Sequence, residues 1–226
     1  MRLALLVDLQ RCLGCDTCTL ACKQENGTPR DVFFARVLNM ETGTFPKVKR
    51  SYLPVLCNHC ADAPCLRACP NKAIFRRSDG IVLIDQDRCN GTGACVSACP
   101  YGNIFLTPSD EWYFPADSPY EHYAKARLEP GKARKCTYCA HRLDQGLEPA
   151  CVVACPGEAR IFGDLEDPES KLSQYLRTQQ ERTGREPFRL LEELATDPST
   201  RYLRPVNGTA TTDASSGNLS GTRAAR

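Results

Sequence analysis

The sequence lacks long apolar runs and a clear excess of either charge. Its longest apolar stretches, such as 3–7 and 150–155, reach about six residues, far short of the roughly 18 that a membrane-spanning helix needs. Residues 1–8 are also too short for the apolar core of a secretory signal. With 29 basic and 27 acidic residues among 226, the net charge of +2 does not indicate a nucleic-acid-binding surface. We therefore expect no direct membrane span, no nucleic-acid partner and no export signal of the chain's own.

Catalytic motifs are lacking as well. The three histidines, His59, His122 and His141, have no paired metal-ligand spacing such as H-E-x-x-H. No phosphate-binding loop and no nucleophile–base pair stands out. His59 and His141 lie next to cysteines, where we expect them to donate hydrogen bonds rather than to bind metal. The sequence thus predicts no catalytic residues in this chain.

Cysteine is the residue that the chain has in excess. Cysteines in a chain without an export signal do not indicate a disulfide scaffold, because reducing compartments keep thiols free. Their odd number would also leave one thiol over. Metal ligation is the remaining interpretation. The fifteen cysteines fall into four groups: Cys12, Cys15, Cys18 and Cys22; Cys57, Cys60, Cys65 and Cys69; Cys89, Cys95 and Cys99; and Cys136, Cys139, Cys151 and Cys155.

The spacing inside these groups indicates iron–sulfur clusters. The first group reads C-x2-C-x2-C-x3-C, the bacterial ferredoxin spacing, in which the fourth thiolate ligates a different cluster from the first three. A proline follows the last cysteine of the other three groups, whereas Lys23 takes its place in the first. Zinc sites use two C-x2-C pairs and have no use for a third thiol two residues on. A zinc-stapled interaction module is therefore the least favoured alternative.

With these motifs the chain resembles the four-cluster iron–sulfur (beta) subunits of the molybdopterin oxidoreductase family, the electron-transfer partners of dimethyl sulfoxide, polysulfide and related enzymes. The resemblance covers about residues 3–165 and is not specific for one substrate, since phenylacetyl-CoA, sulfite or polysulfide oxidoreductase complexes could each use such a chain. It rests on Asp8-x3-Cys12-x2-Cys15-x2-Cys18-x3-Cys22, Cys57-Asn58-His59-Cys60-x4-Cys65, Ala98-Cys99-Pro100-Tyr101-Gly102 and Lys135-Cys136-x2-Cys139-x11-Cys151-x3-Cys155-Pro156.

The third group departs from this repeat. It reads Cys89-Asn90-Gly91-Thr92-Gly93-Ala94-Cys95, so Thr92 stands where a second thiolate is expected. A missing thiolate removes the anchor of one iron, and several members of the resembled family with a non-cysteine residue here hold a 3Fe-4S cluster. We expect three 4Fe-4S clusters and one 3Fe-4S cluster, the latter near the middle of the electron path. The alternative is four 4Fe-4S clusters, with an oxygen ligand from Thr92 or water.

The resemblance also implies which cysteines share a cluster, because outer groups pair with each other in the family and inner groups do the same. Together with the fourth-ligand rule, this predicts four ligand sets. They are Cys12, Cys15, Cys18 and Cys155; Cys22, Cys136, Cys139 and Cys151; Cys57, Cys60, Cys65 and Cys99; and Cys69, Cys89 and Cys95 with Thr92 at the vacant position.

The implied fold is α+β, with two ferredoxin-like halves of the bacterial two-cluster type, inserted loops and a helical C-terminal extension. Residues 2–8 predict a strand, and 73–84 predict a hairpin whose turn ends in Asp-Gly. Helices are predicted from Asp167-Pro168-Glu169 and through 188–194. The expected domains are 1–56 with the first cluster loop and an insertion, 57–105 as the central two-cluster domain, 106–165 with an aromatic insertion and the fourth group, 166–205 as the helical extension, and 206–226 as a disordered tail.

These observations predict an electron-transfer subunit. It would carry electrons between a large molybdopterin catalytic subunit and a membrane-anchor or quinone-interacting subunit, or another acceptor. A self-standing polyferredoxin is the alternative. We expect the chain to be cytoplasmic or peripheral to the inner membrane, and to be exported only with a partner that carries a signal.

Overall fold

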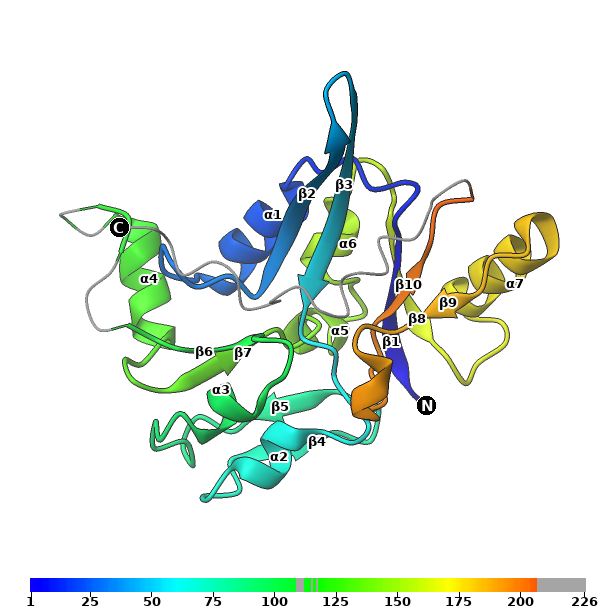
Figure 1. Ribbon diagram of the computed structural model, residues 1–226. Helices are drawn as coiled ribbons and strands as arrows, with labels where there is room; N and C mark the ends of the chain where they lie inside the picture. Colours follow the sequence, from blue (N-terminus) through cyan, green and yellow to red (C-terminus); the bar gives the residue numbers. More distant parts are fainter. Residues whose placement is uncertain (109–111, 115, 117, 207–226) are drawn as a thin grey trace.

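The computed structural model describes residues 1–108, 112–114, 116 and 118–206, and within them the chain is a mixed α+β fold of short elements (Figure 1). The strands are β1 (Leu3–Asp8), β2 (Ala35–Thr44), β3 (Lys47–Leu56), β4 (Ile74–Arg76), β5 (Val82–Ile84), β6 (Ile104–Leu106), β7 (Ala133–Lys135), β8 (Arg160–Asp164), β9 (Pro187–Phe188) and β10 (Arg201–Leu203). The helices are α1 (Thr17–Asn26), α2 (Pro64–Ala68), α3 (Ala94–Ala98), α4 (Pro119–Arg127), α5 (Ala140–Leu143), α6 (Ala150–Val153) and α7 (Lys171–Thr183), with a 3-10 turn at Glu192–Leu194.

The largest sheet joins the two ends of the described chain. Its strand order is β8-β1-β10-β9, with β1 antiparallel to β8 and parallel to β10. Residues 4–7 of β1 are fully buried, as the apolar sequence Ala-Leu-Leu-Val requires at the centre of a sheet covered on both faces. The predicted N-terminal strand is therefore confirmed, and it aligns the first cysteine group with the fourth.

The remaining strands form three two-stranded antiparallel sheets. The short β4–β5 hairpin confirms the one predicted between the second and third groups, and Gly80 takes the left-handed conformation (φ 87°) that its turn needs. The β6–β7 pair connects the third group to the fourth. The β2–β3 hairpin pairs ten residues on each side and projects from the body in Figure 1.

We call residues 41–50, the outer half of this hairpin, the arm. All ten residues of the arm are exposed, and Phe45 near its tip is 87% exposed. The inner half packs into the core through residues such as Leu53 and Val55. The hairpin thus holds an apolar tip away from the body that anchors it.

The C-terminal segment differs from the sequence-based expectation. Helix α7 begins at Lys171 with Ser170 as its cap, not at Asp167, because the Ser170 hydroxyl accepts the Ser173 backbone N–H. The second predicted helix is absent from this described segment, where residues 187–188 form β9 and pair with β10. Left-handed backbone at Leu191 and Ala195 confines helical structure to the 3-10 turn. Apart from Val206, the predicted disordered tail lies outside the described residues.

The aromatic insertion is built around α4. Trp112 packs against Ala124 and Leu128, and Ser118 with Glu121 forms a capping box at the start of the helix. None of the helices in the described segments is both long and apolar enough to cross a membrane.

Candidate iron–sulfur centres

Each of the four cysteine groups lies on a loop with the same backbone conformation at one position. In each, the residue two positions after the first cysteine has a left-handed conformation: Gly14 (φ 67°), His59 (φ 44°), Gly91 (φ 76°) and Tyr138 (φ 51°). This conformation costs little for glycine and is uncommon for other residues. Its recurrence in four copies shows that the groups are structural repeats as well as sequence repeats.

The loop after the last cysteine is also repeated. Where proline follows the cysteine, the third residue beyond the cysteine is again left-handed, at Lys72, Gly102 and Glu158. This turn aims a backbone N–H back at the sulfur. The N–H of Ala73 donates to Cys69 Sγ and that of Ala159 donates to Cys155 Sγ, each at 3.3 Å. Such N–H···S bonds stabilise a thiolate.

The first group lacks this turn because Lys23 stands in place of the proline. Without the proline to end it, α1 continues to Asn26, whose side-chain Nδ2 lies 3.5 Å from Cys22 Sγ. The Lys23 ammonium donates to the carbonyls of Pro29 and Val32 and so closes the following loop. In the first group a side-chain amide therefore donates to the last cysteine sulfur, as the backbone N–H groups of Ala73 and Ala159 do in the second and fourth groups.

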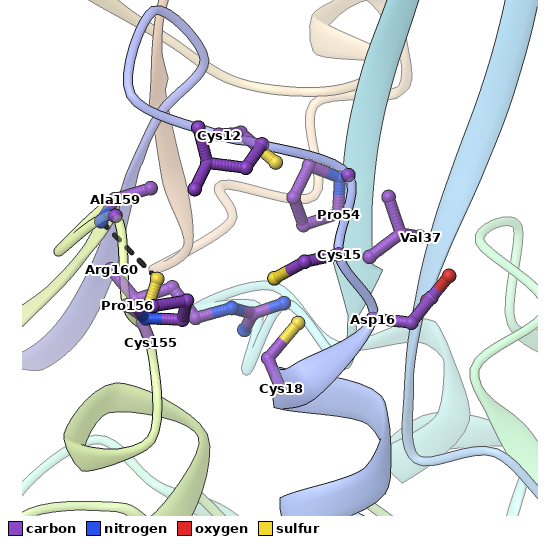
Figure 2. Close-up of a pocket in the computed structure, with 13 residues that line it drawn as sticks. Cys12, Cys15, Asp16, Cys18, Val37, Pro54, Cys155, Pro156, Ala159 and Arg160 are labelled. Atoms are coloured by element: carbon purple, nitrogen blue, oxygen red, sulfur yellow. Dashed lines mark hydrogen bonds between the residues drawn. The ribbon is translucent and has the colours of Figure 1, made fainter.

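Four cysteines from the first and fourth groups surround one hollow of about 340 Å³. Figure 2 shows the sulfurs of Cys12, Cys15, Cys18 and Cys155 facing a common space, with the Arg160 side chain beside them. Tyr52 of β3 closely packs against Gly14, where an added Cβ would lie 2.3 Å from the Tyr52 ring. The glycine therefore allows the loop to approach the hairpin.

A second hollow, of about 350 Å³, lies between the second and third groups. Cys57, Cys60 and Cys65 line it together with Cys99, so it again combines three cysteines of one group with the last cysteine of another. The two hollows thus have cysteine linings of the same kind, which agrees with the repeated loops that build them.

The other seven cysteines also lie in sets drawn from two groups. Burial raises the pKa of Cys22, and the nearby thiols of Cys139 and Cys151 raise it further; Cys136 interacts electrostatically with all three. Cys95 in turn adjoins Cys69 and Cys89. Among the residues that the structure describes, no three His, Cys, Asp or Glu side chains are arranged to hold a single metal ion.

Burial sets the protonation of most of these thiols. Loss of water raises the pKa of Cys60 and Cys65 to about 12 and that of Cys139 to about 11. Cys15 is the exception, since it is exposed and a hydrogen bond with the Thr17 hydroxyl at 3.4 Å lowers its pKa. Iron must displace the proton from each buried thiol, so metal binding releases protons here.

Thr92 lies on a loop of the same shape as the one that carries Cys15. Gly14 and Asp16 flank Cys15 in left-handed conformations, and Gly91 and Gly93 flank Thr92 in the same way. Both Cys15 and Thr92 are exposed. The threonine therefore occupies the second ligand position of an otherwise preserved loop.

Among the charged and histidine residues near the cysteines, His59 and Lys135 are buried. His59 Nδ1 accepts the Val82 N–H at 3.1 Å, so this nitrogen accepts a hydrogen bond rather than donating one, and burial lowers the pKa of the ring. His141 instead lies 2.7 Å from Glu25. Lys135 is 3% exposed and donates to the Cys136 carbonyl.

Arg160 was not identified from the sequence. It is 3% exposed and directs a guanidinium nitrogen to Cys151 Sγ at 3.6 Å. An arginine five residues after a cysteine has no recognisable motif, so only the antiparallel pairing of β8 with β1 reveals its position.

Comparison with known proteins gives consistent matches. The 4Fe-4S dicluster domain family matches residues 48–113 and 111–165. The iron–sulfur subunit ArrB of the arsenate respiratory reductase of Shewanella sp. strain ANA-3 is 39% identical over 90% of this chain and 97% of its own length. A putative iron–sulfur subunit of a dimethyl sulfoxide reductase from Halobacterium salinarum is 41% identical, over 88% and 78%. A tetrathionate reductase subunit from Salmonella typhimurium is 40% identical, over 92% and 70%.

These relatives cover most of both chains, and the matched domain includes three of the four cysteine groups. They confirm the resemblance noted from the motifs, and the multiple 4Fe-4S clusters expected with it. The chain belongs to the iron–sulfur (beta) subunits of the molybdopterin oxidoreductases, and its function is electron transfer within such a complex.

Proposed function

We propose that the fifteen cysteines hold four clusters in the ligand sets expected from the sequence. The first cluster takes Cys12, Cys15, Cys18 and Cys155; the second takes Cys22, Cys136, Cys139 and Cys151; the third takes Cys57, Cys60, Cys65 and Cys99; and the fourth takes Cys69, Cys89 and Cys95. The observation that carries this proposal is the pair of hollows, each lined by three cysteines of one group and one of another.

The residues present fit such clusters. Backbone N–H groups already aim at cysteine sulfurs, as Tyr138 does toward Cys136 at 3.4 Å and Ala133 toward Cys89 at 3.4 Å. One nitrogen of the Arg160 guanidinium is buried without a hydrogen-bond partner, as expected beside an acceptor such as a cluster sulfide. When bound, the clusters supply one-electron redox chemistry with potentials set by their surroundings.

For the fourth site we propose a 3Fe-4S cluster. Three thiols adjoin one another there, and the fourth position of the repeated loop carries the neutral hydroxyl of Thr92. A hydroxyl is a poor substitute for a thiolate, because iron–sulfur clusters are held by anionic sulfur ligands.

Contacts between neighbouring sets support a single row. The thiol of Cys18 in the first set is close enough to Cys151 of the second for their charges to interact. In the same way, the thiol of Cys57 in the third set interacts electrostatically with Cys136 of the second. The thiol of Cys95 in the fourth set interacts electrostatically with Cys65 of the third. This order favours a place for the Thr92 cluster at one end of the row, not near the middle as expected from the sequence.

The two ends of the row are where partners would exchange electrons. Cys15 is exposed at the first end, close to the exposed side chains of Leu13 and Leu20 and to the hairpin that bears the arm. We assign this end to the large molybdopterin subunit, because a permanent partner needs an extended, partly apolar surface. The other end, at Thr92, would serve a membrane-anchor or quinone-interacting subunit.

The proposal includes the arrangement of the chain and its location. The domains at 57–105 and 106–165, the latter paired with 1–56, would form two ferredoxin-like halves, with 166–205 as an extension. The complex would be cytoplasmic or peripheral to the inner membrane. Its substrate would react on the large subunit, to which the cysteine-bound clusters of this chain would pass electrons or from which they would receive them.

Anaerobic purification of the tagged chain from its host tests this function. We expect a large molybdopterin subunit to co-purify and the isolated chain to turn over no organic substrate. A chain that purifies alone, with four clusters and no partner, would support the polyferredoxin alternative instead.

A further inference from the structure

Arg160 is a buried cation without a carboxylate partner. Its side chain begins at the start of β8 and is 3% exposed. Within the described part of the chain, its electrostatic neighbours are cysteine thiols and the Tyr202 phenol, not an Asp or a Glu. A buried charge is costly unless an opposite charge compensates it. The compensating negative charge therefore has to come from the cysteine sites.

The guanidinium contacts thiols of two different ligand sets. One nitrogen lies 3.6 Å from Cys151 Sγ, and the side chain also lines the first hollow together with Cys18. The positive charge of Arg160 also interacts with the thiols of Cys12 and Cys22. Figure 2 shows Arg160 beside Cys18 and Cys155 of the first hollow. Since its guanidinium also reaches Cys151 of the second set, Arg160 lies between the two sites.

Lys135 occupies an equivalent place between the second and third sets. It is 3% exposed, and its ammonium donates to the carbonyls of Cys136 and Val82. Val82 lines the hollow of the third set together with Cys65 and Cys99, so the ammonium lies beside that site as well. In the described residues no carboxylate pairs with it either, whereas nearby Lys132 pairs with Glu129 at 2.6 Å.

We propose that Arg160 and Lys135 are potential-setting residues, each shared by two neighbouring clusters: Arg160 by the first and second, and Lys135 by the second and third. This inference rests on the proposed ligand sets. A thiolate-ligated cluster is anionic and gains a further negative charge when it takes up one electron, with no bond made or broken. A buried cation beside it stabilises the reduced form and raises the potential.

Redox titration of the purified complex, with dithionite as the electron donor and cluster signals followed by electron paramagnetic resonance, tests the inference. Arg160→Gln should lower two of the four potentials, and Lys135→Gln should also lower two, with one cluster affected by both variants. The expected size is on the order of a tenfold change in the ratio of reduced to oxidised cluster, or about 59 mV for a one-electron couple.

Two matched variants control for loss of charge alone. Arg11 adjoins Cys12 but pairs with exposed Glu158 at 2.6 Å, and Lys132 pairs with Glu129. Arg11→Gln and Lys132→Gln should leave all four potentials unchanged. Unshifted potentials in both test variants, or equal shifts of all four clusters, would overturn the inference.

If a variant loses iron, its iron content distinguishes a charge role of Arg160 from a packing role. If Arg160→Gln does not retain the first and second clusters, Arg160→Lys must retain them, because charge rather than shape compensates the thiolates. Loss of iron from both variants would overturn the inference and leave Arg160 a packing role. A wild-type chain that holds fewer than four clusters would instead refute the proposed ligand sets, before any variant is compared.

Discussion

Thr92 is the residue at which the chain departs from its own repeat, and the departure is confined to the side chain. The flanking residues Gly91 and Gly93 keep the backbone that positions Cys15 in the first group. At Gly91 an added Cβ would lie 2.4 Å from the carbonyl oxygen of Gly131, so the loop is also fixed by its neighbour. A cysteine at 92 would therefore enter a loop already shaped for a ligand.

We predict that Thr92→Cys converts the fourth cluster from 3Fe-4S to 4Fe-4S. The added thiolate anchors the missing iron and, as an anionic ligand, lowers the cluster potential. Electron paramagnetic resonance of the oxidised protein should show the 3Fe-4S signal in the wild type and lose it in the variant. Ser97→Cys, which adds a thiol on the exposed face of α3, should keep the signal. A wild type without this signal would indicate an oxygen ligand at the fourth iron.

At the scale of elements, Asp8 joins the C-terminal extension to the first cluster loop. It is fully buried at the end of β1, and Arg185 donates to both of its carboxylate oxygens, at 2.8 Å and 3.0 Å. The Tyr175 hydroxyl of α7 donates to it at 2.7 Å. The conformation of the loop that begins at Leu9 thus depends on residues more than 160 positions away.

We predict that Asp8→Asn destabilises the protein by about 3–5 kcal/mol, because it leaves the Arg185 guanidinium, whose side chain is 9% exposed, without its carboxylate partner. Urea unfolding followed by tryptophan fluorescence or circular dichroism measures this, and hydrogen exchange should locate the loss in α7 and β10. Glu181→Gln, at an exposed position of α7, is the control and should change stability by less than about 0.5 kcal/mol. Equal stability of the two variants would contradict the role assigned to the ion pair.

The arm, the outer half of the β2–β3 hairpin, carries exposed apolar side chains. Phe45 and Val48 are exposed by 87% and 50% on a hairpin that projects from the body (Figure 1). Exposed apolar side chains that lie close together on one element indicate a protein interface.

We predict that Phe45→Ser combined with Val48→Ser weakens the affinity for the large subunit, by at least tenfold or about 1.4 kcal/mol, with the iron content unchanged. Pull-down of the large subunit, performed at graded concentrations, measures the loss. Thr42→Ala on the same arm should bind as the wild type does. Full binding by the double variant would place the large subunit elsewhere on the chain.

Sequence and structure agree where the chemistry is local. The cysteine spacing and the prolines that follow three of the groups were enough to identify the cysteine groups, because each loop is built from consecutive residues. The β4–β5 hairpin was predicted for the same reason. The β1–β10 pairing and the place of Arg160 were not, because they depend on contacts between distant segments. Helix periodicity at 188–194 failed because pairing of Phe188 with Tyr202 overrides local propensity.

At the scale of the whole molecule, the cysteines are part of the core rather than attached to it. Seven of them, including Cys18, Cys57 and Cys136, belong to the main buried cluster together with residues such as Leu5 and Tyr202. Because burial raises the pKa of core thiols such as Cys136 and Cys151, the metal-free fold gains no ionic interactions from them. The bound iron would therefore contribute to folding as well as to electron transfer.

The central claim is that this core holds four iron–sulfur clusters. Its most direct test is the iron, acid-labile sulfide and zinc content of the anaerobically purified chain, measured per polypeptide by mass spectrometry and sulfide assay. Three 4Fe-4S clusters and one 3Fe-4S cluster require about 15 iron atoms and no stoichiometric zinc, whereas four complete cubanes would give about 16. Stoichiometric zinc with little iron or sulfide would contradict the account.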